Sequence, residues 1–284
     1  MRGGRAAALM RTMNLSARTP LDDLERYYDA APRSSARAED FGPLTLFVRE
    51  GAGWHYYARP ALGHAGPVTA ADVDQVRARQ RELGAPEAFE WVAEVSPGLR
   101  AAVEESGLAV HEHPLMVLDP EAPAAEPHPL VRVLGPDDPL LHAALVVPQL
   151  AFAAPGTGVG PAGPAELAAR ITAQAGDGRA GQVAGRIRAG HSAMAAAIED
   201  GLPLCSGMHN PVGPVTEIVG VGTLPAARRR GLGRAVTAAL VADARARGAA
   251  TVFLSAGDAD VARMYATLGF RPAGTALIAE PIDA

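Results

Sequence analysis

The chain has 284 residues, of which 48% are hydrophobic and 20% charged, and its formal net charge is −5 at pH 7. No apolar run reaches the roughly 20 residues that a membrane-spanning helix needs, the single cysteine, Cys205, excludes an intramolecular disulfide framework, and the negative charge argues against a dedicated nucleic-acid binder. We therefore expect a cytoplasmic protein of one or two domains that binds neither nucleic acid nor membranes.

In the first part of the chain, the pattern of apolar residues predicts alternating helices and strands. The helix 69–83 has the clearest ends, because Thr69 is a good N-cap and Gly84 a good terminator. The expected order is strands 44–49 and 55–58, helix 69–83, strand 89–92, helix 98–106 and strand 109–118.

A proline-rich segment then divides the chain. Residues 119–129 (DPEAPAAEPHP) favour neither a helix nor a paired strand, because proline lacks the N–H that both require. This predicts a domain at 1–118, a linker at 119–129 and a second domain at 130–284. In the second domain we expect strand 130–134, helix 139–152, a Gly/Pro-rich loop 153–165, helix 179–188, strands 192–198, 203–209 and 215–223, helix 231–247, strand 251–255, helix 260–268 and strand 273–279.

The two parts repeat one pattern. The segment 84–89 (GAPEAF) matches 248–253 (GAATVF) at an offset of 164, and Gly107 matches Gly269 at an offset of 162. In both copies a helix, a glycine, a strand, a second helix, a second glycine and a second strand follow in that order. We interpret this as two copies of one α/β unit, although a chance match of a common pattern is the alternative.

A glycine-bearing turn in the second copy predicts a phosphate site. Strand 215–223 leads into Arg228-Arg-Arg-Gly-Leu-Gly233, and a helix follows directly. A helix N-terminus presents free N–H groups and the positive end of the helix dipole, glycines let a ligand approach the backbone, and arginines add positive charge. A dinucleotide-binding turn would need glycine where Val236 stands, and no Walker A sequence is present.

This turn resembles the acetyl-CoA motif Arg-x-x-Gly-x-Gly of the GNAT superfamily. A second resemblance lies at 258–270 (DADVARMYATLGF), although Asp258 stands where the family usually has Asn. The resemblance implies an α/β mixed-sheet fold with two GNAT-like N-acyltransferase units in tandem, the first of them degenerate, since 64–70 has no arginine and no Gly-x-Gly. It implies acetyl-CoA as the co-substrate, with no metal. The cofactor-binding residues that it implies are Val221, Gly222, Thr223, Arg228, Arg229, Arg230, Gly231, Leu232, Gly233, Arg234, Asp258 and Tyr265.

The resemblance also implies a mechanism. Glu217 is the candidate base that deprotonates an amine, with a water relay as the alternative, and Tyr265 is the candidate acid that protonates the leaving thiolate. Main-chain N–H groups of Val221 to Thr223 are expected to polarise the acetyl carbonyl. Transfer would be direct, in a ternary complex, because Cys205 is expected to pack in the core rather than to carry the acyl group.

The acceptor is expected to be an amine-bearing small molecule or a protein amine. His191, His209 and Asn210 lie near expected strand ends, where they could meet it or simply be turn residues. A CoA-binding sensor or scaffold without turnover, and a non-enzymatic interaction protein, are the alternative functions. The sequence leaves the oligomeric state open, a homodimer included.

Overall fold

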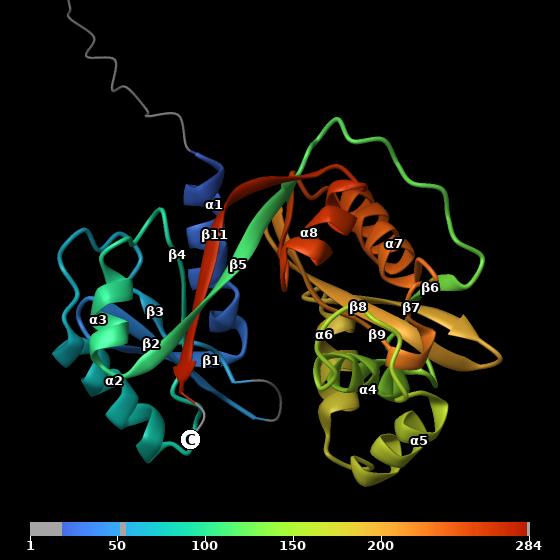
Figure 1. Cartoon of the computed structure of the whole chain (residues 1–284), viewed down its shortest axis with the longest axis horizontal. Coiled ribbons are helices and arrows are strands. Elements are labelled where there is room, and N and C mark those ends of the chain that lie inside the picture. The colour runs from blue at the N-terminus through green and yellow to red at the C-terminus, as the bar shows by residue number, and fades with distance from the viewer. Residues whose placement is uncertain (1–18, 52–54, 283–284) are drawn as a thin grey trace, which may run out of the picture.

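The computed structural model describes residues 19–51 and 55–282. The first half of the chain forms one lobe of a mixed α/β fold and the second half forms the other (Figure 1). The elements of the first half are α1 (Pro20–Ala30), the 3₁₀ turn Pro32–Ser34, β1 (Ala36–Asp40), β2 (Leu44–Arg49), β3 (Arg59–Pro60), α2 (Ala70–Glu82), β4 (Phe89–Val92), α3 (Leu99–Glu105) and β5 (Leu108–Leu118).

The second half begins after the proline-rich segment. Its elements are β6 (Val131–Leu134), α4 (Leu141–Phe152), α5 (Pro164–Ala173), α6 (Arg179–Arg188), β7 (Ala193–Glu199), β8 (Leu202–Val212), β9 (Val215–Thr223), the 3₁₀ turn Pro225–Ala227, α7 (Leu232–Ala246), β10 (Thr251–Ser255), α8 (Ala259–Ala266) and β11 (Phe270–Pro281). Helices α7 and α8 cover one face of this lobe's sheet, and α4, α5 and α6 lie on the other face (Figure 1).

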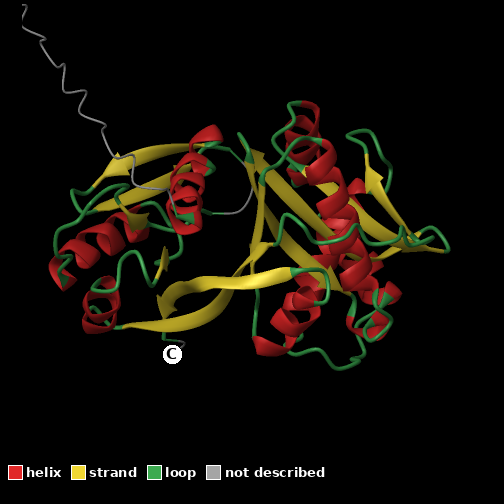
Figure 2. Ribbon diagram, turned by 90° about the horizontal axis from the view of Figure 1, so that it is seen from above, coloured by secondary structure: helices red, strands yellow, loops and turns green. Residues whose placement is uncertain are grey.

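One sheet of eight strands crosses both lobes, in the order β4-β11-β5-β10-β9-β8-β7-β6. Strand β5 of the first half lies between β10 and β11 and is antiparallel to both. Conversely, β11 of the second half lies between β4 and β5 and is antiparallel to both. Each half therefore inserts its last strand between the last two strands of the other. Figure 2 shows this long strand pair running from one lobe to the other.

The predicted repeat is visible in the order of elements. In both halves three consecutive antiparallel strands (β1 to β3 and β7 to β9) are followed by a helix, a short strand, a second helix and a long final strand. The matched glycines Gly84, Gly248, Gly107 and Gly269 all have positive φ, between 61° and 93°. A left-handed residue directly after a helix favours glycine, so the glycines of the repeat mark equivalent helix ends. The mixed α/β fold predicted from the sequence is confirmed.

Some elements differ from the prediction. The expected strand 55–58 is wrong: the strand is β3 at Arg59–Pro60, and Ala58 makes only an isolated bridge to Phe89. Helices α1 and α5 and strand β1 were not predicted. Helix α1 nevertheless has a sequence signal, because Thr19 and Asp22 form a reciprocal capping box around Pro20. Residues 119–129 contain neither helix nor strand, and the domain boundaries at 118 and 130 stay a prediction.

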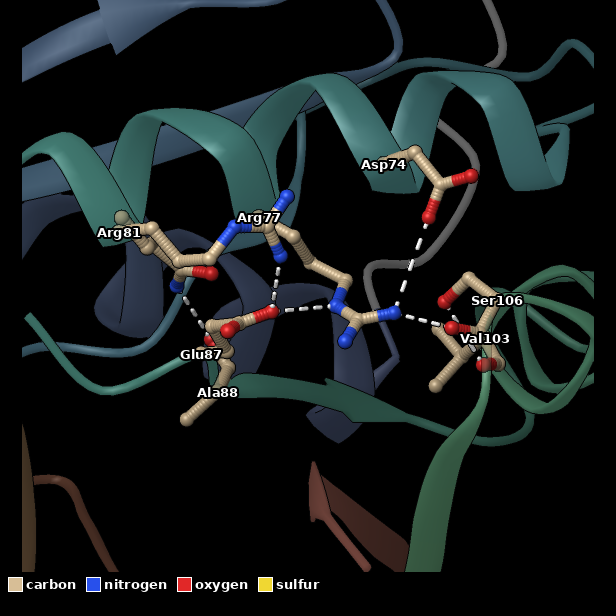
Figure 3. A network of polar contacts seen from close by, with 8 residues as sticks. Asp74, Arg77, Arg81, Glu87, Ala88, Val103 and Ser106 are labelled. Atoms are coloured by element: carbon tan, nitrogen blue, oxygen red, sulfur yellow. Dashed lines mark hydrogen bonds and ion pairs between the residues drawn. The ribbon is translucent and has the colours of Figure 1, made fainter.

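Ion pairs hold α2 in the first half. This helix buries only Val73, Val76 and Gln80. The Arg77 Nε donates to Glu87 at 2.6 Å, and another nitrogen of Arg77 donates to the Ser106 carbonyl at the end of α3 (Figure 3). The corresponding α7 buries a broad stripe of side chains (Leu232, Val236, Thr237, Leu240, Val241 and Ala244). In the first unit, ion pairs and hydrogen bonds of arginine therefore hold the helix where the second unit uses apolar packing.

A proline inside α4 leaves one helical carbonyl without its usual donor, and a serine of the sheet supplies that hydrogen bond. Pro148 has no N–H to donate to the carbonyl of Ala144. The buried Ser206 hydroxyl of β8 donates to that carbonyl instead, at 2.6 Å. Helix α4 also comes very close to β9, because a Cβ on Gly222 would lie 2.8 Å from the Pro148 Cα. No helix in the described ranges is long and apolar enough to cross a membrane.

Candidate active site

The site begins where two parallel strands separate. Strands β9 and β10 pair only from Val215↔Thr251 to Glu217↔Phe253. Beyond this point β10 pairs with β5 alone and β9 with β8 alone. The edge of β9 that faces β10 therefore carries unpaired backbone groups from Ile218 onward. Unpaired groups on a strand edge are ready hydrogen-bond partners for a ligand.

A β-bulge between β8 and β9 lies next to this separation. The register between β8 and β9 shifts after the pair Met208↔Val219, and it resumes at Ser206↔Gly222. Gly207 alone therefore faces Gly220 and Val221, and Gly220 has a φ of +62°. A bulge bends its strand and changes the direction of the backbone groups around it. The bulge includes Val221 and lies directly before Gly222 and Thr223, and these three residues are the ones predicted to face the acetyl group.

The predicted phosphate turn ends in an uncapped helix. Gly231 is the N-cap of α7, has a φ of +75°, and has no side chain to bond the first N–H groups. The bond from the Ala235 N–H to the Gly231 carbonyl shows where the helical ladder begins, so the N–H groups of Leu232, Gly233 and Arg234 lack intrahelical acceptors. A Cβ on Gly231 would meet no atom within 4 Å. This open, uncapped N-terminus suits the pyrophosphate of CoA.

The first unit closes the equivalent helix end. Thr69 and Asp72 form a capping box at the start of α2: the Asp72 N–H donates to the Thr69 hydroxyl at 3.3 Å, and the Thr69 N–H donates to the Asp72 carboxylate at 2.9 Å. A carboxylate thus occupies the region where α7 has open space. Both the cap and its negative charge oppose a phosphate.

Of the four arginines predicted to bind CoA, three already have partners within the chain. Arg228 donates to the carbonyls of Gly158, Ala151 and Ala154, at 3.1, 2.8 and 2.7 Å, and so fastens the loop after α4. Arg230 pairs with Glu199 at 2.6 Å, and the Arg234 Nε donates to the Thr267 hydroxyl at 3.1 Å. Arg229 is exposed, and its side chain has no hydrogen bond or ion pair with any described residue. Arg229 is therefore the guanidinium most available to a phosphate.

Tyr265 and Asp258 lie at the two ends of α8. Tyr265 is 6% exposed, packs edge-on against Phe270, and contacts the Thr237 hydroxyl of α7. Burial raises the pKa of its phenol well above the ordinary value, so the group stays protonated. The Asp258 carboxylate accepts from the Val261 N–H at 2.8 Å and is the N-cap of α8. Cys205 is fully buried, and burial raises the pKa of its thiol to about 12, which agrees with a packing role.

Glu217 lies at the last residue pair before the strands separate. It is partly exposed and is flanked by Asn210 on β8 and Phe253 on β10. Its poorly solvated surroundings, and to a lesser extent the charge of Glu90, raise the pKa of its carboxyl to about 8, while Arg59 acts in the opposite direction. The Tyr28 hydroxyl donates to its Oε1 at 3.4 Å. A carboxyl of this kind exchanges a proton near neutral pH, as a general base must.

Three of these neighbours come from the first half and were missed in the sequence. Tyr28 lies on α1, Arg59 on β3 and Glu90 on β4. Only α1 carried a detectable signal, the capping box at Thr19. The pairing that brings all three to Glu217 joins residues far apart in the chain, so no local pattern marks them.

The three residues suggested as contacts for the acceptor, His191, His209 and Asn210, lie in different surroundings. His209 is wrong as such a contact, because it is fully buried, with Nδ1 2.9 Å from the Thr216 hydroxyl and Nε2 2.8 Å from the Asp243 carboxylate. Asn210 accepts from the Ser192 hydroxyl at 2.7 Å and lies beside Glu217. His191 is exposed, and its carbonyl accepts from Arg186 at 3.2 Å.

Comparison with known proteins agrees with this geometry. Residues 176–270 match the acetyltransferase (GNAT) family, and no curated protein matches the sequence. The chain is similar to the solved structure of a GCN5-related N-acetyltransferase from Kribbella flavida, with 23% identity, a TM-score of 0.65 and coverage of 94% of this chain and 98% of that one. It is also similar to a putative GNAT-family acetyltransferase from Novosphingobium aromaticivorans, with 18% identity, a TM-score of 0.56 and coverage of 93% and 98%.

A third similar structure is described as a tandem GNAT protein from the clavulanic acid biosynthesis pathway, with 15% identity, a TM-score of 0.51 and coverage of 85% of this chain and 79% of that one. At these identities the solved structures establish the fold, and the matched segment 176–270 contains the separated strands, the bulge and the turn described above. The segment 176–270 therefore matches the acetyltransferase (GNAT) family, and the chain as a whole has the fold of these solved structures, including that of a tandem GNAT protein.

Proposed function

We propose that this protein is an N-acetyltransferase that moves an acetyl group from acetyl-CoA to an amine in a ternary complex. One observation carries the proposal. Strand β9 holds Glu217, a carboxyl with a raised pKa, at the point where it leaves β10, and the same strand leads to the uncapped N-terminus of α7. The residue that we propose as the proton acceptor and the turn that we propose as the anion site thus lie at the two ends of one unpaired strand edge.

The donor side is supported by the turn and the strand edge. The N–H groups that precede Ala235 would bind the pyrophosphate, with Arg229 as an additional cation. The unpaired edge of β9 after Glu217 would bind the pantetheine arm, and the N–H groups of Val221 to Thr223 would polarise the acetyl carbonyl. Acyl transfer is also the reaction class that the match to the GNAT family supports.

The proton transfers follow from the two titratable groups. Glu217 accepts a proton from the ammonium form of the acceptor, and the freed nitrogen forms a bond to the acetyl carbon as the carbon–sulfur bond breaks. Tyr265 donates its phenolic proton to the departing sulfur and regains one from the new amide nitrogen. Glu217 then releases its proton to solvent. The acceptor is an amine-bearing small molecule or a protein amine.

A panel of amines tests this function directly. Each amine is mixed with the protein and acetyl-CoA, and released thiol is measured with a colour reagent. Because the chain contains no lysine, acetylation of its own lysine side chains cannot release thiol. We expect acceptor-dependent thiol release that falls in Glu217→Gln and in Gly231→Asp. Tight acetyl-CoA binding by calorimetry, without transfer to any amine, would support the sensor or scaffold function instead.

A further inference from the structure

A polar cluster from the first half surrounds the carboxylate of Glu217. The Tyr28 hydroxyl donates to Glu217 Oε1 at 3.4 Å. The Arg59 guanidinium lies over the Tyr28 ring, 3.9 Å from its centroid, and the Arg59 Nη1 donates to Glu90 at 2.7 Å. Three elements of the first lobe, namely α1, β3 and β4, thus supply a continuous chain of contacts that ends on β9 of the second lobe.

Burying these polar groups costs more free energy than apolar packing at the same place would. The side chain of Arg59 is 6% exposed, and its Nη2 atom is buried with no hydrogen-bond partner among the described residues. The hydrophobic core at the junction has Leu24, Val92 and Phe253 among its members. A buried charge costs several kcal/mol unless it is well paired, and an apolar side chain at this position would avoid that cost. The charge of Arg59 is therefore expected to serve the nearby Glu217, on which it acts through space while it pairs with Glu90.

We propose that the first half of the chain is the positioning unit for the base of the second half: Tyr28 orients the Glu217 carboxylate, and Arg59, held by Glu90 and stacked on Tyr28, sets the charge that this carboxylate experiences. This inference rests on the proposed function and gives a role to the unit whose helix N-terminus is capped. None of the three residues is assigned a contact with substrate, so each is a positioning residue.

The charges around Glu217 make the direction of each effect predictable. Glu90 and Arg59 act on it from β4 and β3, and Tyr28 acts from α1. Tyr27, also on α1, donates to the Asn210 carbonyl at 2.8 Å on the strand beside Glu217, and its own surroundings include Arg186 of α6. Glu25 lies near Arg59 on the α1 side. Removing Arg59 takes away the positive charge that opposes Glu90, so the pKa of Glu217 should rise. Removing the charge of Glu90 leaves the positive charge of Arg59 to favour ionised Glu217, so its pKa should fall.

The experiment compares pH profiles of kcat/KM, measured with one acceptor throughout, in variants that are expected to shift the pKa of Glu217 in opposite directions. The acidic limb of the profile reports the pKa of the base. We expect Arg59→Met to move this limb to higher pH by about one unit, so that kcat/KM is about tenfold lower at pH values below the limb. We expect Glu90→Gln to move the limb to lower pH. Tyr28→Phe keeps the ring beneath Arg59 but lowers kcat and raises the limb. Arg59→Lys, which keeps the charge, should restore most of the wild-type profile.

A matched control comes from the same half. Arg100 on α3 pairs with Glu104 and Glu112 and is not among the charged groups that act on Glu217, so Arg100→Gln should leave the profile unchanged. If Arg59→Met does not fold, Glu90→Gln and Tyr28→Phe still test the inference. Limbs that stay at the wild-type position, or that move in the same direction in Arg59→Met and Glu90→Gln, would overturn it.

A second readout separates this inference from the proposed function. Carbon-13 NMR of glutamate-labelled protein, with Glu217→Gln to assign the signal, follows the carboxyl without any turnover. A wild-type protein that transfers no acetyl group contradicts the proposed function. A Glu217 titration that is insensitive to both Arg59 and Glu90 contradicts the inference drawn here, whether or not the enzyme is active.

Discussion

The hydroxyl of Tyr28 lies 3.4 Å from the Oε1 atom of Glu217, although the two residues are 189 positions apart in the chain. The contact joins the first helix of one half to the strand that carries the candidate base in the other half. It places the junction between the lobes beside the residue that we propose as the base. Substitutions near this junction in either lobe should therefore change the rate of proton transfer to Glu217.

The phenol of Tyr265 provides the most direct test of the acid. In Tyr265→Phe one hydroxyl is lost and the edge-on packing against Phe270 remains, so stability and acetyl-CoA affinity should barely change. We expect kcat to fall by about 10²- to 10⁴-fold, the usual contribution of a positioned proton donor. The KM for the donor should stay constant, because the charge on sulfur exists only during the reaction. Near-normal kcat under chemistry-limited conditions would leave Tyr265 a packing residue.

Gly231→Asp should abolish CoA binding and leave the fold intact. The new Cβ would meet no protein atom within 4 Å, so the loss would come from the negative charge and the side chain at the phosphate position. Gly231→Asn is the matched control, because it adds a similar side chain at a φ of +75° without the charge. Calorimetry should show a greater loss of affinity for Asp than for Asn. Equal affinities in wild type and the folded Asp variant would remove the turn from the binding site.

The raised pKa of Glu217 should also appear in stability. The folded protein holds a proton on this carboxyl up to about pH 8, whereas an ordinary glutamate loses it near pH 4.5. Between these values the folded state binds more protons, so the free energy of unfolding contributed by this group falls as the pH rises. Glu217→Gln should therefore gain melting temperature relative to wild type between pH 5 and pH 8. The exposed Glu105→Gln should show no such trend; a parallel trend in both variants would refute the assignment.

The contact between Ser206 and the Ala144 carbonyl predicts a coupled pair of substitutions. Ser206→Ala should lower the free energy of unfolding by about 1–3 kcal/mol, because a buried carbonyl loses its donor. Pro148→Ala restores the helical N–H that this carbonyl lacks. In that background Ser206→Ala should cost clearly less, as a double-mutant cycle in urea would measure. Additive effects would show that the hydroxyl is not compensating for the proline.

Local patterns accounted for much of the fold and for the turn at which we propose that the acetyl donor binds. The helix ends at Gly84 and Gly248, the strand 215–223 and the turn at Gly231 all depend on chain neighbours, so sequence periodicity and glycine spacing were enough to predict them. The same reasoning missed β1 (Ala36–Asp40), because this short strand, ARAED, is mostly polar and lies at the edge of the smaller sheet.

Long-range contacts were beyond the sequence. Nothing near Arg228 indicates that its guanidinium donates to one carbonyl in the last turn of α4 and to two in the loop that follows, since these residues lie 70 to 77 positions earlier. The neighbours of Glu217 were missed for the same reason, because the pairing of β5 with β11 and β10 brings the first half to the site. The predicted linker at 119–129 suggested separable domains, and it gave no indication of a shared sheet.

The exchange of β5 and β11 has a consequence for how such a molecule can be divided. Cutting the chain at the proline-rich segment would leave β10 and β11 of the second unit without the strand that lies between them, and exposed strand edges of this kind recruit other chains. A single unit could fill the gap only with the final strand of another copy, in a symmetrical pair. The tandem chain thus resembles a domain-swapped dimer whose subunits have been fused, and of the two equivalent helices α2 begins with a capping box whereas α7 begins without a side-chain cap.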